Sequence, residues 1–219
     1  MILIADTDAI LKLCAYDLWD EAVACLGVAP ASVLTLVQAR FMFARYARTA
    51  RKTDRYTEPG IQRALTVAHA ASAVTLPQDL EEQDALVAAG ARLSPDKPPL
   101  DPGEVLLFLQ GAALDEAFYL TTGDKRALAA LASVPEAERV REALRGRVLC
   151  VEQLLLRLTD DLGVGEVSVR VRRVPACDTA IANVFGRSAP APHDAVFDGL
   201  TSEIDALRRN TAELLAQDL

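Results

Sequence analysis

The sequence is short of the side chains that build zinc sites and disulfide frameworks. It has four cysteines without C-x-x-C spacing, and its two histidines, His69 and His193, lie far apart along the chain. This scarcity argues against a zinc site and against a disulfide network. Aromatic residues make up only 5% of the chain against 51% hydrophobic residues overall, which predicts a globular, aliphatic core. No apolar run approaches the roughly 20 residues of a membrane-spanning helix, so we expect no membrane association.

Positive charge is also scarce. The chain has 31 acidic and 23 basic residues, a formal net charge of −8. This balance disfavours a general affinity for nucleic acid, because phosphate binding relies on Lys and Arg, although it leaves room for a local basic patch. The opening segment has no basic stretch before its apolar residues, and Asp6 interrupts them early. We therefore expect no signal peptide and a cytoplasmic protein.

The N-terminus presents an apolar run that ends in two carboxylates. Residues 2–5 are apolar, Asp6 and Asp8 follow, and a helical pattern begins at once. In open α/β sheets, functional side chains gather at the carboxyl ends of buried strands. Asp6 and Asp8 are therefore the first candidates for a functional site.

Short apolar segments alternate with helical patterns along residues 1–160. We expect strands at residues 2–5, 28–34, 72–76, 118–122 and 146–152. We expect helices at residues 9–26, 34–52, 61–71 and 80–91, and again after Asp101, Asp124 and Glu152. This alternation predicts an α/β protein with a parallel five-stranded sheet between helices, in a three-layer α/β/α arrangement.

The character of the chain changes over residues 161–219, which we interpret as a mainly helical C-terminal extension. Val167, Val169 and Val171 alternate with polar residues, which predicts a half-buried edge strand. A proline-bearing linker follows at residues 188–192, and then an amphipathic helix. Its apolar stripe consists of Phe197, Leu200, Ile204, Leu207, Thr211 and Leu214. Such a stripe packs on its own domain or, alternatively, forms a homodimer through this helix.

The predicted helix at residues 34–52 turns basic toward its end. Arg45, Arg48, Lys52 and Arg55 continue the spacing of its apolar stripe, and aromatic residues are interleaved with them. A helix that leaves the core and becomes basic is suited to hold RNA. The alternative is a solvated helix end whose arginine stems cover apolar surface.

Four acids are candidates for the functional site: Asp6, Asp8, Glu104 and Asp124. Each stands at a strand end or a helix start, so each is also a candidate helix cap. The carboxyl ends of parallel strands share one edge of a sheet, which predicts that Asp6 and Asp124 face the same crevice. Crowded carboxylates repel one another unless a cation neutralises them, and oxygen ligands favour Mg²⁺ or Mn²⁺. The pattern therefore indicates metal-dependent hydrolysis of phosphodiester bonds.

Three segments, in this order and spacing, resemble the PIN-domain family over roughly residues 1–158. They are Ile-Ala-Asp6-Thr-Asp8-Ala-Ile-Leu, Leu-Asp-Pro-Gly-Glu104 and Thr-Thr-Gly-Asp124-Lys-Arg-Ala-Leu. PIN domains are mostly Mg²⁺- or Mn²⁺-dependent ribonucleases, and many are toxins of bacterial toxin–antitoxin pairs. The resemblance implies an endoribonuclease with Asp6, Glu104 and Asp124 as catalytic metal ligands and Asp8 as an auxiliary ligand. It also implies RNA as substrate and an antitoxin-like protein as a partner.

Two alternatives remain beside this resemblance. The family usually places a further acid on the helix after the second strand, where this chain has Gln38 and Arg40. This departure leaves open a catalytically weak or inactive PIN-like module that binds RNA or protein. The opening Asp6-Thr-Asp8 also resembles haloacid-dehalogenase-like phosphatases, with Asp6 as nucleophile. We prefer the nuclease, because the phosphatase would leave Glu104 without a role.

Overall fold

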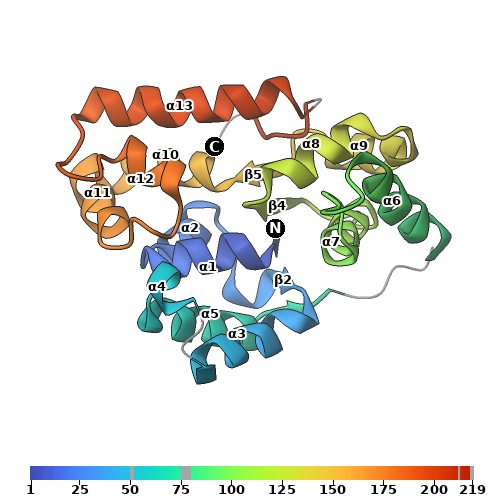
Figure 1. Cartoon of the computed structure of the whole chain (residues 1–219), viewed down its shortest axis with the longest axis horizontal. Helices are drawn as coiled ribbons and strands as arrows, with labels where there is room; N and C mark the ends of the chain where they lie inside the picture. Colours follow the sequence, from blue (N-terminus) through green and yellow to red (C-terminus); the bar gives the residue numbers. More distant parts are fainter. Residues whose placement is uncertain (50–51, 75–79, 212, 218–219) are drawn as a thin grey trace.

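A parallel β-sheet of five strands forms the centre of the molecule, as the sequence predicts (Figure 1). The computed structural model describes residues 1–49, 52–74, 80–211 and 213–217. The strands are β1 (Ile2–Ala5), β2 (Val33–Thr35), β3 (Ser72–Ala73), β4 (Phe118–Thr122) and β5 (Val148–Cys150). Their order is β3-β2-β1-β4-β5, and every neighbouring pair is parallel. Parts of two predicted elements, residues 50–51 and 75–76, lie outside the described residues.

The central strand β1 is buried on both of its faces. Leu3 and Ala5 join a hydrophobic cluster with helices that include α1 (Thr7–Ala15), α5 (Glu58–Ala70) and α10 (Val151–Leu162). Ile4, which points the other way, joins a second cluster built largely by residues 105–144. A strand buried on both faces needs a continuous apolar run, which is what residues 2–5 supply.

The predicted helix at residues 9–26 is two helices, α1 and α2 (Trp19–Cys25). Asp17 between them has a φ of 57°, in the left-handed region that ends a helix. The chain then turns so that the Leu18 N–H donates to the carbonyl of Leu13 at 2.8 Å. Leu18 and Trp19 are both buried after this turn. The helical spacing of apolar residues therefore continues past Asp17, and the sequence pattern does not show that the helix ends there.

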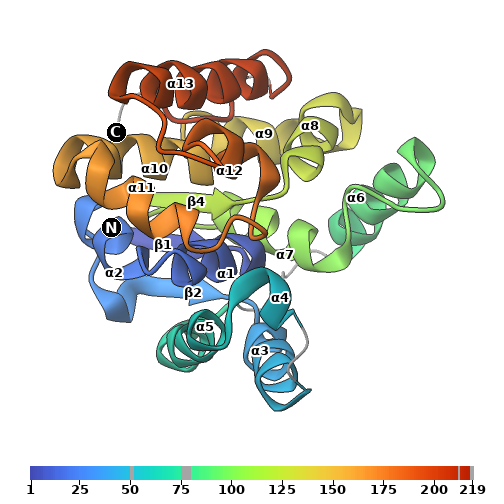
Figure 2. The same cartoon turned by 60° about the vertical axis from the view of Figure 1, so that its left-hand side comes forward.

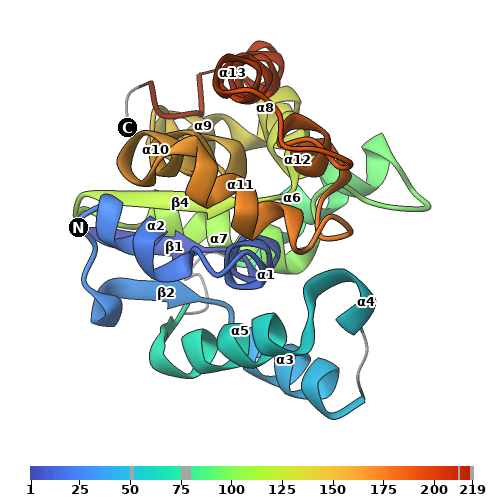
Figure 3. The ribbon, with the colours of Figure 1, turned by 90° about the vertical axis from the view of Figure 1, so that its left-hand side faces the viewer.

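Helices α3 (Val37–Thr49), α4 (Thr53–Tyr56) and α5 lie together on one side of the molecule, at the bottom of Figure 3. Helix α5 packs closely on α1, and Gly60 permits this approach. A Cβ at position 60 would stand 2.8 Å from the Cα of Ala15. Helix α5, on which α3 packs, is therefore fixed against the helix that follows Asp6.

The second half of the sheet is connected by further helices. Helices α6 (Leu80–Leu93) and α7 (Pro102–Ala112) lie between β3 and β4 in the chain, and α8 (Lys125–Ser133), the 3₁₀ turn η2 (Pro135–Ala137) and α9 (Glu138–Leu144) lie between β4 and β5. Helix α10 follows β5, and another 3₁₀ turn, η1 (Pro30–Ser32), precedes β2. Helix α6 is the outermost of them and projects away from the sheet (Figure 2). Within the described ranges, no helix is both long and apolar enough to cross a membrane.

The predicted edge strand around Val167–Val171 is wrong, because these residues form helix α11 (Val164–Arg172). Val167 and Val171 are fully buried, whereas Val169 is 47% exposed. When valines occupy every second position, alternate valines are four residues apart and lie on one face of a helix, so the spacing fits either structure. Val164 extends the buried face by one helical turn, and burial against the core selects the helix.

The amphipathic helix near the C-terminus is α13 (His193–Arg209), which follows α12 (Thr179–Val184). It packs on α10, as the first of the two interpretations expects (Figure 1). Leu200, Ile204 and Leu207 of the predicted stripe are buried, whereas Phe197 is half-buried, and the predicted Thr211 and Leu214 follow the end of the helix at Arg209. The helical part of the stripe is therefore covered mainly by the chain itself.

The chain after α13 returns to the sheet. The Val148 N–H donates to the carbonyl of Leu214 at 3.0 Å, and the Ala216 N–H donates to the carbonyl of Val148 at 2.9 Å. These bonds cover the outer edge of β5, which would otherwise be open for pairing. The side-chain amide of Gln153 donates to the carbonyl of Ala216 at 2.8 Å and fixes this return to α10. The predicted division at residue 160 falls inside α10, on which α11 and α13 pack.

Because α13 packs on its own chain, Leu200→Ala is expected to lower the free energy of unfolding by about 2–5 kcal/mol. Leu200 is 0% exposed, so the substitution opens a cavity against α10. Val169→Ala, on the exposed face of α11, is the matched control and should change stability by no more than about 0.5 kcal/mol. Urea titration measures both values. A loss of dimer mass in Leu200→Ala, seen by sedimentation, would instead support the helix as an interface.

Candidate functional site

The candidate site lies where β1 and β4 end side by side. These neighbouring strands are each followed by a helix start, and the sheet order reverses direction between them. The Asp6 N–H donates to the carbonyl of Thr121 at 3.0 Å, so Asp6 is held at the carboxyl end of both strands. A cavity of about 900 Å³ opens here. The four predicted acids, Asp6, Asp8, Glu104 and Asp124, all line it.

Asp6 is buried at the floor of this cavity, with 7% of its surface exposed. Its Oδ1 accepts a hydrogen bond from the Thr7 N–H at 2.6 Å, and its Oδ2 accepts one from the Thr122 hydroxyl at 3.3 Å. Burial and the nearby charge of Asp8 raise the pKa of Asp6 to about 6, although the bonds from Thr7 oppose this rise. Asp6 is therefore a helix cap and also an acid held in an unfavourable environment.

Glu104 stands at the start of α7 in a capping box with Asp101. Its Oε2 accepts the Asp101 N–H at 2.9 Å, and Oδ1 of Asp101 accepts the Gly103 and Glu104 N–H groups at 2.8 and 2.9 Å. Burial raises the pKa of Glu104 to about 8. The hydrogen bond from Asp101 opposes the rise, and the charges of Asp101, Asp124 and Asp6 add to it.

Asp124 caps α8 from the end of β4. Its Oδ1 accepts the Arg126 and Ala127 N–H groups at 2.8 and 3.1 Å, and its Oδ2 pairs with the Arg126 guanidinium at 3.1 Å. Burial on its own would raise the pKa of Asp124, but these hydrogen bonds, with the charge of Arg126, lower it. The Asp124 N–H donates to the Thr122 hydroxyl at 3.1 Å. Thr122 thus connects Asp124 to Asp6.

Asp8 differs from the other three acids because a lysine neutralises it. The Lys12 ammonium lies 2.8 Å from Oδ2 of Asp8, one helical turn away, and 2.8 Å from Oδ2 of Asp178. The Tyr56 hydroxyl donates to Oδ1 of Asp8 at 3.2 Å. Burial on its own would lower the pKa of Lys12, but the two carboxylates outweigh it and raise the pKa, so Lys12 is cationic.

The C-terminal segment reaches the site at two points. Asp178 caps α12 and binds Lys12, while Glu203 of α13 pairs with Lys125 at 2.8 Å. Lys125 also pairs with the buried Glu152 of α10 at 2.7 Å. Sequence reasoning found Asp8 but missed Lys12, Lys125 and the acids Asp178, Glu152 and Glu203 that pair with them. The spacing of Asp8 and Lys12 was a local signal for their pair, whereas nothing local indicates that Asp178 or Glu203 folds back onto the site.

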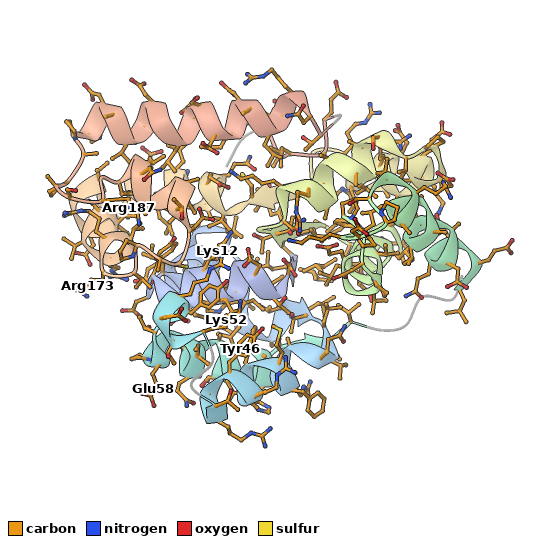
Figure 4. The ribbon with its side chains drawn as sticks, in the orientation of Figure 1. Lys12, Tyr46, Lys52, Glu58, Arg173 and Arg187 are labelled. Atoms are coloured by element: carbon orange, nitrogen blue, oxygen red, sulfur yellow. The ribbon has the colours of Figure 1, made fainter. Side chains whose placement is uncertain are left out.

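The predicted RNA-binding residues are not all in one environment. Arg45 and Arg48 are exposed on α3, and Lys52 is exposed before α4. Arg55 instead lines the cavity, and its Nε donates to the carbonyl of Cys177 at 3.0 Å. Figure 4 shows Lys12 in the middle of the molecule and Lys52 below it in the α3–α4 region.

The donor chemistry of the cavity fits the Mg²⁺ or Mn²⁺ that the resemblance implies. Asp6 and Glu104 have no cationic side chain within ion-pair distance among the described residues, and burial raises the pKa of both. A divalent cation would compensate exactly this kind of carboxylate pair. As the side chains stand, no three His, Cys, Asp or Glu residues in the described part of the chain converge closely enough to hold a metal. Ligation therefore requires side-chain rotation within the cavity.

Asp6→Asn is expected to stabilise the metal-free protein at neutral pH. The pKa of Asp6 is about 6 in the folded state instead of the ordinary 3.8, so folded Asp6 keeps its proton to higher pH than unfolded Asp6 does. The free energy of unfolding therefore falls as pH rises from 3.8 to 6. Removing the charge should raise the unfolding free energy by about 3 kcal/mol above pH 6 and change little near pH 4. Denaturant titration with a chelator, across this pH range, measures the effect.

Asp124→Asn is the matched control with the opposite sign. The pKa of Asp124 is lowered, so its carboxylate stabilises the fold above its ordinary pKa, and this contribution is lost as pH falls. We expect the substitution to destabilise the protein at pH 7 and less so at acid pH. A pH-independent effect of Asp6→Asn would contradict the burial of an ionised Asp6.

Comparison with known proteins supplies no family for the chain. No family model matches the sequence, and no curated protein or solved structure is significantly similar to it. The acidic cavity at the ends of β1 and β4 is accordingly the feature from which a function has to be inferred.

Proposed function

We propose that this protein is an Mg²⁺- or Mn²⁺-dependent endoribonuclease with a three-layer, PIN-like fold. The observation that carries the proposal is a set of two carboxylates, the buried Asp6 and the half-buried Glu104, that line one cavity with Asp124 and have no ion-pair partner among the described residues. Such a cavity at the carboxyl ends of parallel strands, where the sheet order reverses, is where α/β proteins bind their ligands. Carboxylate ligands for a hard cation, open to solvent on one side, suit phosphodiester hydrolysis.

Asp6, Glu104 and Asp124 would hold the ion. Once bound, it would lower the pKa of a water molecule and stabilise negative charge on the phosphate in the transition state. Thr7 and Thr122 orient the carboxylate of Asp6 through hydrogen bonds at 2.6 and 3.3 Å. The Asp101 N–H positions Glu104 at 2.9 Å. These bonds keep Asp6 and Glu104 at the cavity, where rotation of their side chains would bring them onto an ion.

Helix α3 supplies a surface along which RNA would approach. Gln38 and Met42 of this helix line the cavity, so α3 runs directly past its opening. Phe41 is 67% exposed on the same helix, and Arg45 follows one turn later. Exposed aromatic rings stack on unpaired bases, and arginines bind phosphates, so this combination suits a single-stranded substrate.

The catalytic part of the proposal predicts that Asp6→Asn, Glu104→Gln and Asp124→Asn each lose activity. Each substitution removes a charged ligand, and we expect cleavage of single-stranded RNA with Mn²⁺ to fall by about 100-fold or more. Rates are measured with end-labelled RNA and with DNA of the same sequence. Asp198→Asn, on the exposed surface of α13, is the control and should match wild type.

The outcomes of this experiment separate the three interpretations. Equal cleavage by wild type and all three variants would remove these acids from the mechanism. RNA binding without cleavage would favour an inactive binding module, an alternative that the neutral amide of Gln38 in the cavity supports. Turnover of small phosphate esters, with a phosphorylated Asp6 trapped by mass spectrometry, would favour the phosphatase.

The binding part of the proposal predicts that Arg45→Ala with Arg48→Ala weakens RNA binding. We expect the Kd to rise by about tenfold and the slope of log Kd against log salt to shrink by about 1.4, since two phosphate contacts are lost. Fluorescence anisotropy with a chelator present measures binding without cleavage. Arg187→Ala with Arg209→Ala removes the same charge from the exposed surface of the C-terminal segment and should leave Kd near the wild-type value.

A further inference from the structure

We propose that Lys12 is a fixed cation that keeps Asp8 out of the metal-ligand set, so that the cavity binds a single divalent ion. This inference rests on the proposed function and specifies its site. Lys12 takes the position beside Asp8 that a second ion would otherwise occupy. Asp178, from the C-terminal segment, becomes a positioning residue for this lysine.

Asp8 differs from Asp6 because one of its two oxygens already binds a buried cation. Its Oδ2 is 2.8 Å from the Lys12 ammonium, and its Oδ1 accepts the Tyr56 hydroxyl at 3.2 Å. Lys12 has only 6% of its surface exposed, and Tyr56 is buried as well. Both oxygens of Asp8 therefore face neighbours that do not move away without opening the core.

The space beside this ion pair is also filled. The backbone of Gly123 packs directly against it, and a Cβ at position 123 would stand 2.3 Å from Oδ2 of Asp8 and 3.1 Å from Nζ of Lys12. A glycine is thus required where β4 leads into α8. No volume remains on this side of Asp8 for an ion with its own ligand shell.

Lys12 is held from two directions that are far apart in sequence. Oδ2 of Asp178 binds its ammonium at 2.8 Å, while Oδ1 of the same residue accepts the Ala180 and Ile181 N–H groups at 3.0 and 3.3 Å. The adjacent carbonyl of Cys177 accepts the Nε of Arg55 at 3.0 Å, which fixes this turn to α4. The lysine is therefore preorganised by its surroundings.

The charges of the cavity divide into two groups. Lys12 compensates Asp8 and Asp178, and Asp6 and Glu104 remain without a cationic partner within the described residues. Asp124 is partly compensated, because it pairs with the exposed Arg126 at 3.1 Å. One divalent ion completes the charge balance around Asp6, Glu104 and Asp124. A second ion at Asp8 would be repelled by the buried ammonium.

The number of Mn²⁺ ions bound per chain tests the inference. Isothermal titration calorimetry on the full chain without RNA is expected to give one ion for wild type and two for Lys12→Met, because Asp8 is then free. Asp8→Asn combined with Lys12→Met should return the count to one. Two ions on wild type, or one on a folded Lys12→Met, would overturn the proposal.

A second variant keeps the test decisive if Lys12→Met does not fold, since it leaves two carboxylates unpaired. Asp8→Asn leaves Lys12 paired with Asp178, and it should retain one Mn²⁺ at near wild-type affinity. A loss of about tenfold or more in affinity would identify Asp8 as a contributor to the metal site and contradict the inference. Thermal unfolding verifies that each variant is folded.

The two proposals fail in different ways. If wild type cleaves RNA but binds two Mn²⁺ ions, only the role of Lys12 is wrong. If wild type binds no Mn²⁺ and leaves RNA intact, the proposed nuclease function falls and the single-ion site falls with it.

Discussion

The in-register pairing of β1 with β4 is the contact on which the candidate site depends. Ala5 stands opposite Thr121, and the next backbone bond joins Asp6 to the Thr121 carbonyl at 3.0 Å. This register brings the Thr122 hydroxyl to Asp6 and places Asp124 beside it. Leu3 and Ile4 are buried in separate clusters on the two faces of the sheet. A shift of β1 by one residue would exchange these faces and turn Asp6 toward the opposite side, so the burial of Leu3 and Ile4 also fixes the position of Asp6.

Capping and ligand binding are compatible roles for the same carboxylates. Asp6 and Asp124 use one oxygen for the N–H groups of the helix start, and Glu104 uses one for the Asp101 N–H. A carboxylate has acceptor positions to spare, so a cap holds the group in place and leaves it able to bind an ion. The two interpretations of these acids are therefore compatible, since the caps keep the acids at the cavity without using all of their acceptor positions.

Local patterns predicted most of the sheet and the grouping of the four acids, because β-α alternation and strand ends are visible in the sequence. They did not distinguish a helix from a strand at Val167 and Val171, where both periods fit and core contacts decide. They also placed Asp8 beside Asp6 among the candidate acids, without an indication that Asp8 is paired with a lysine. The difference between the two arises from Tyr56 and Asp178, which approach from distant parts of the chain. Partners that only tertiary packing supplies leave no local signal.

The distribution of buried charge explains why the C-terminal segment belongs to the site. Buried ion pairs repay their desolvation only when geometry and partners are complete. Lys12 and Glu152 are both buried. Lys12 pairs with Asp178 of this segment. Glu152 pairs with Lys125, which also pairs with Glu203 of this segment. Asp6 and Glu104 have no ion-pair partner within the part of the chain that the structure describes. The fold thus pairs Asp8 and Asp178 with Lys12 and leaves Asp6 and Glu104 at the cavity as the carboxylates that the proposed cation would compensate.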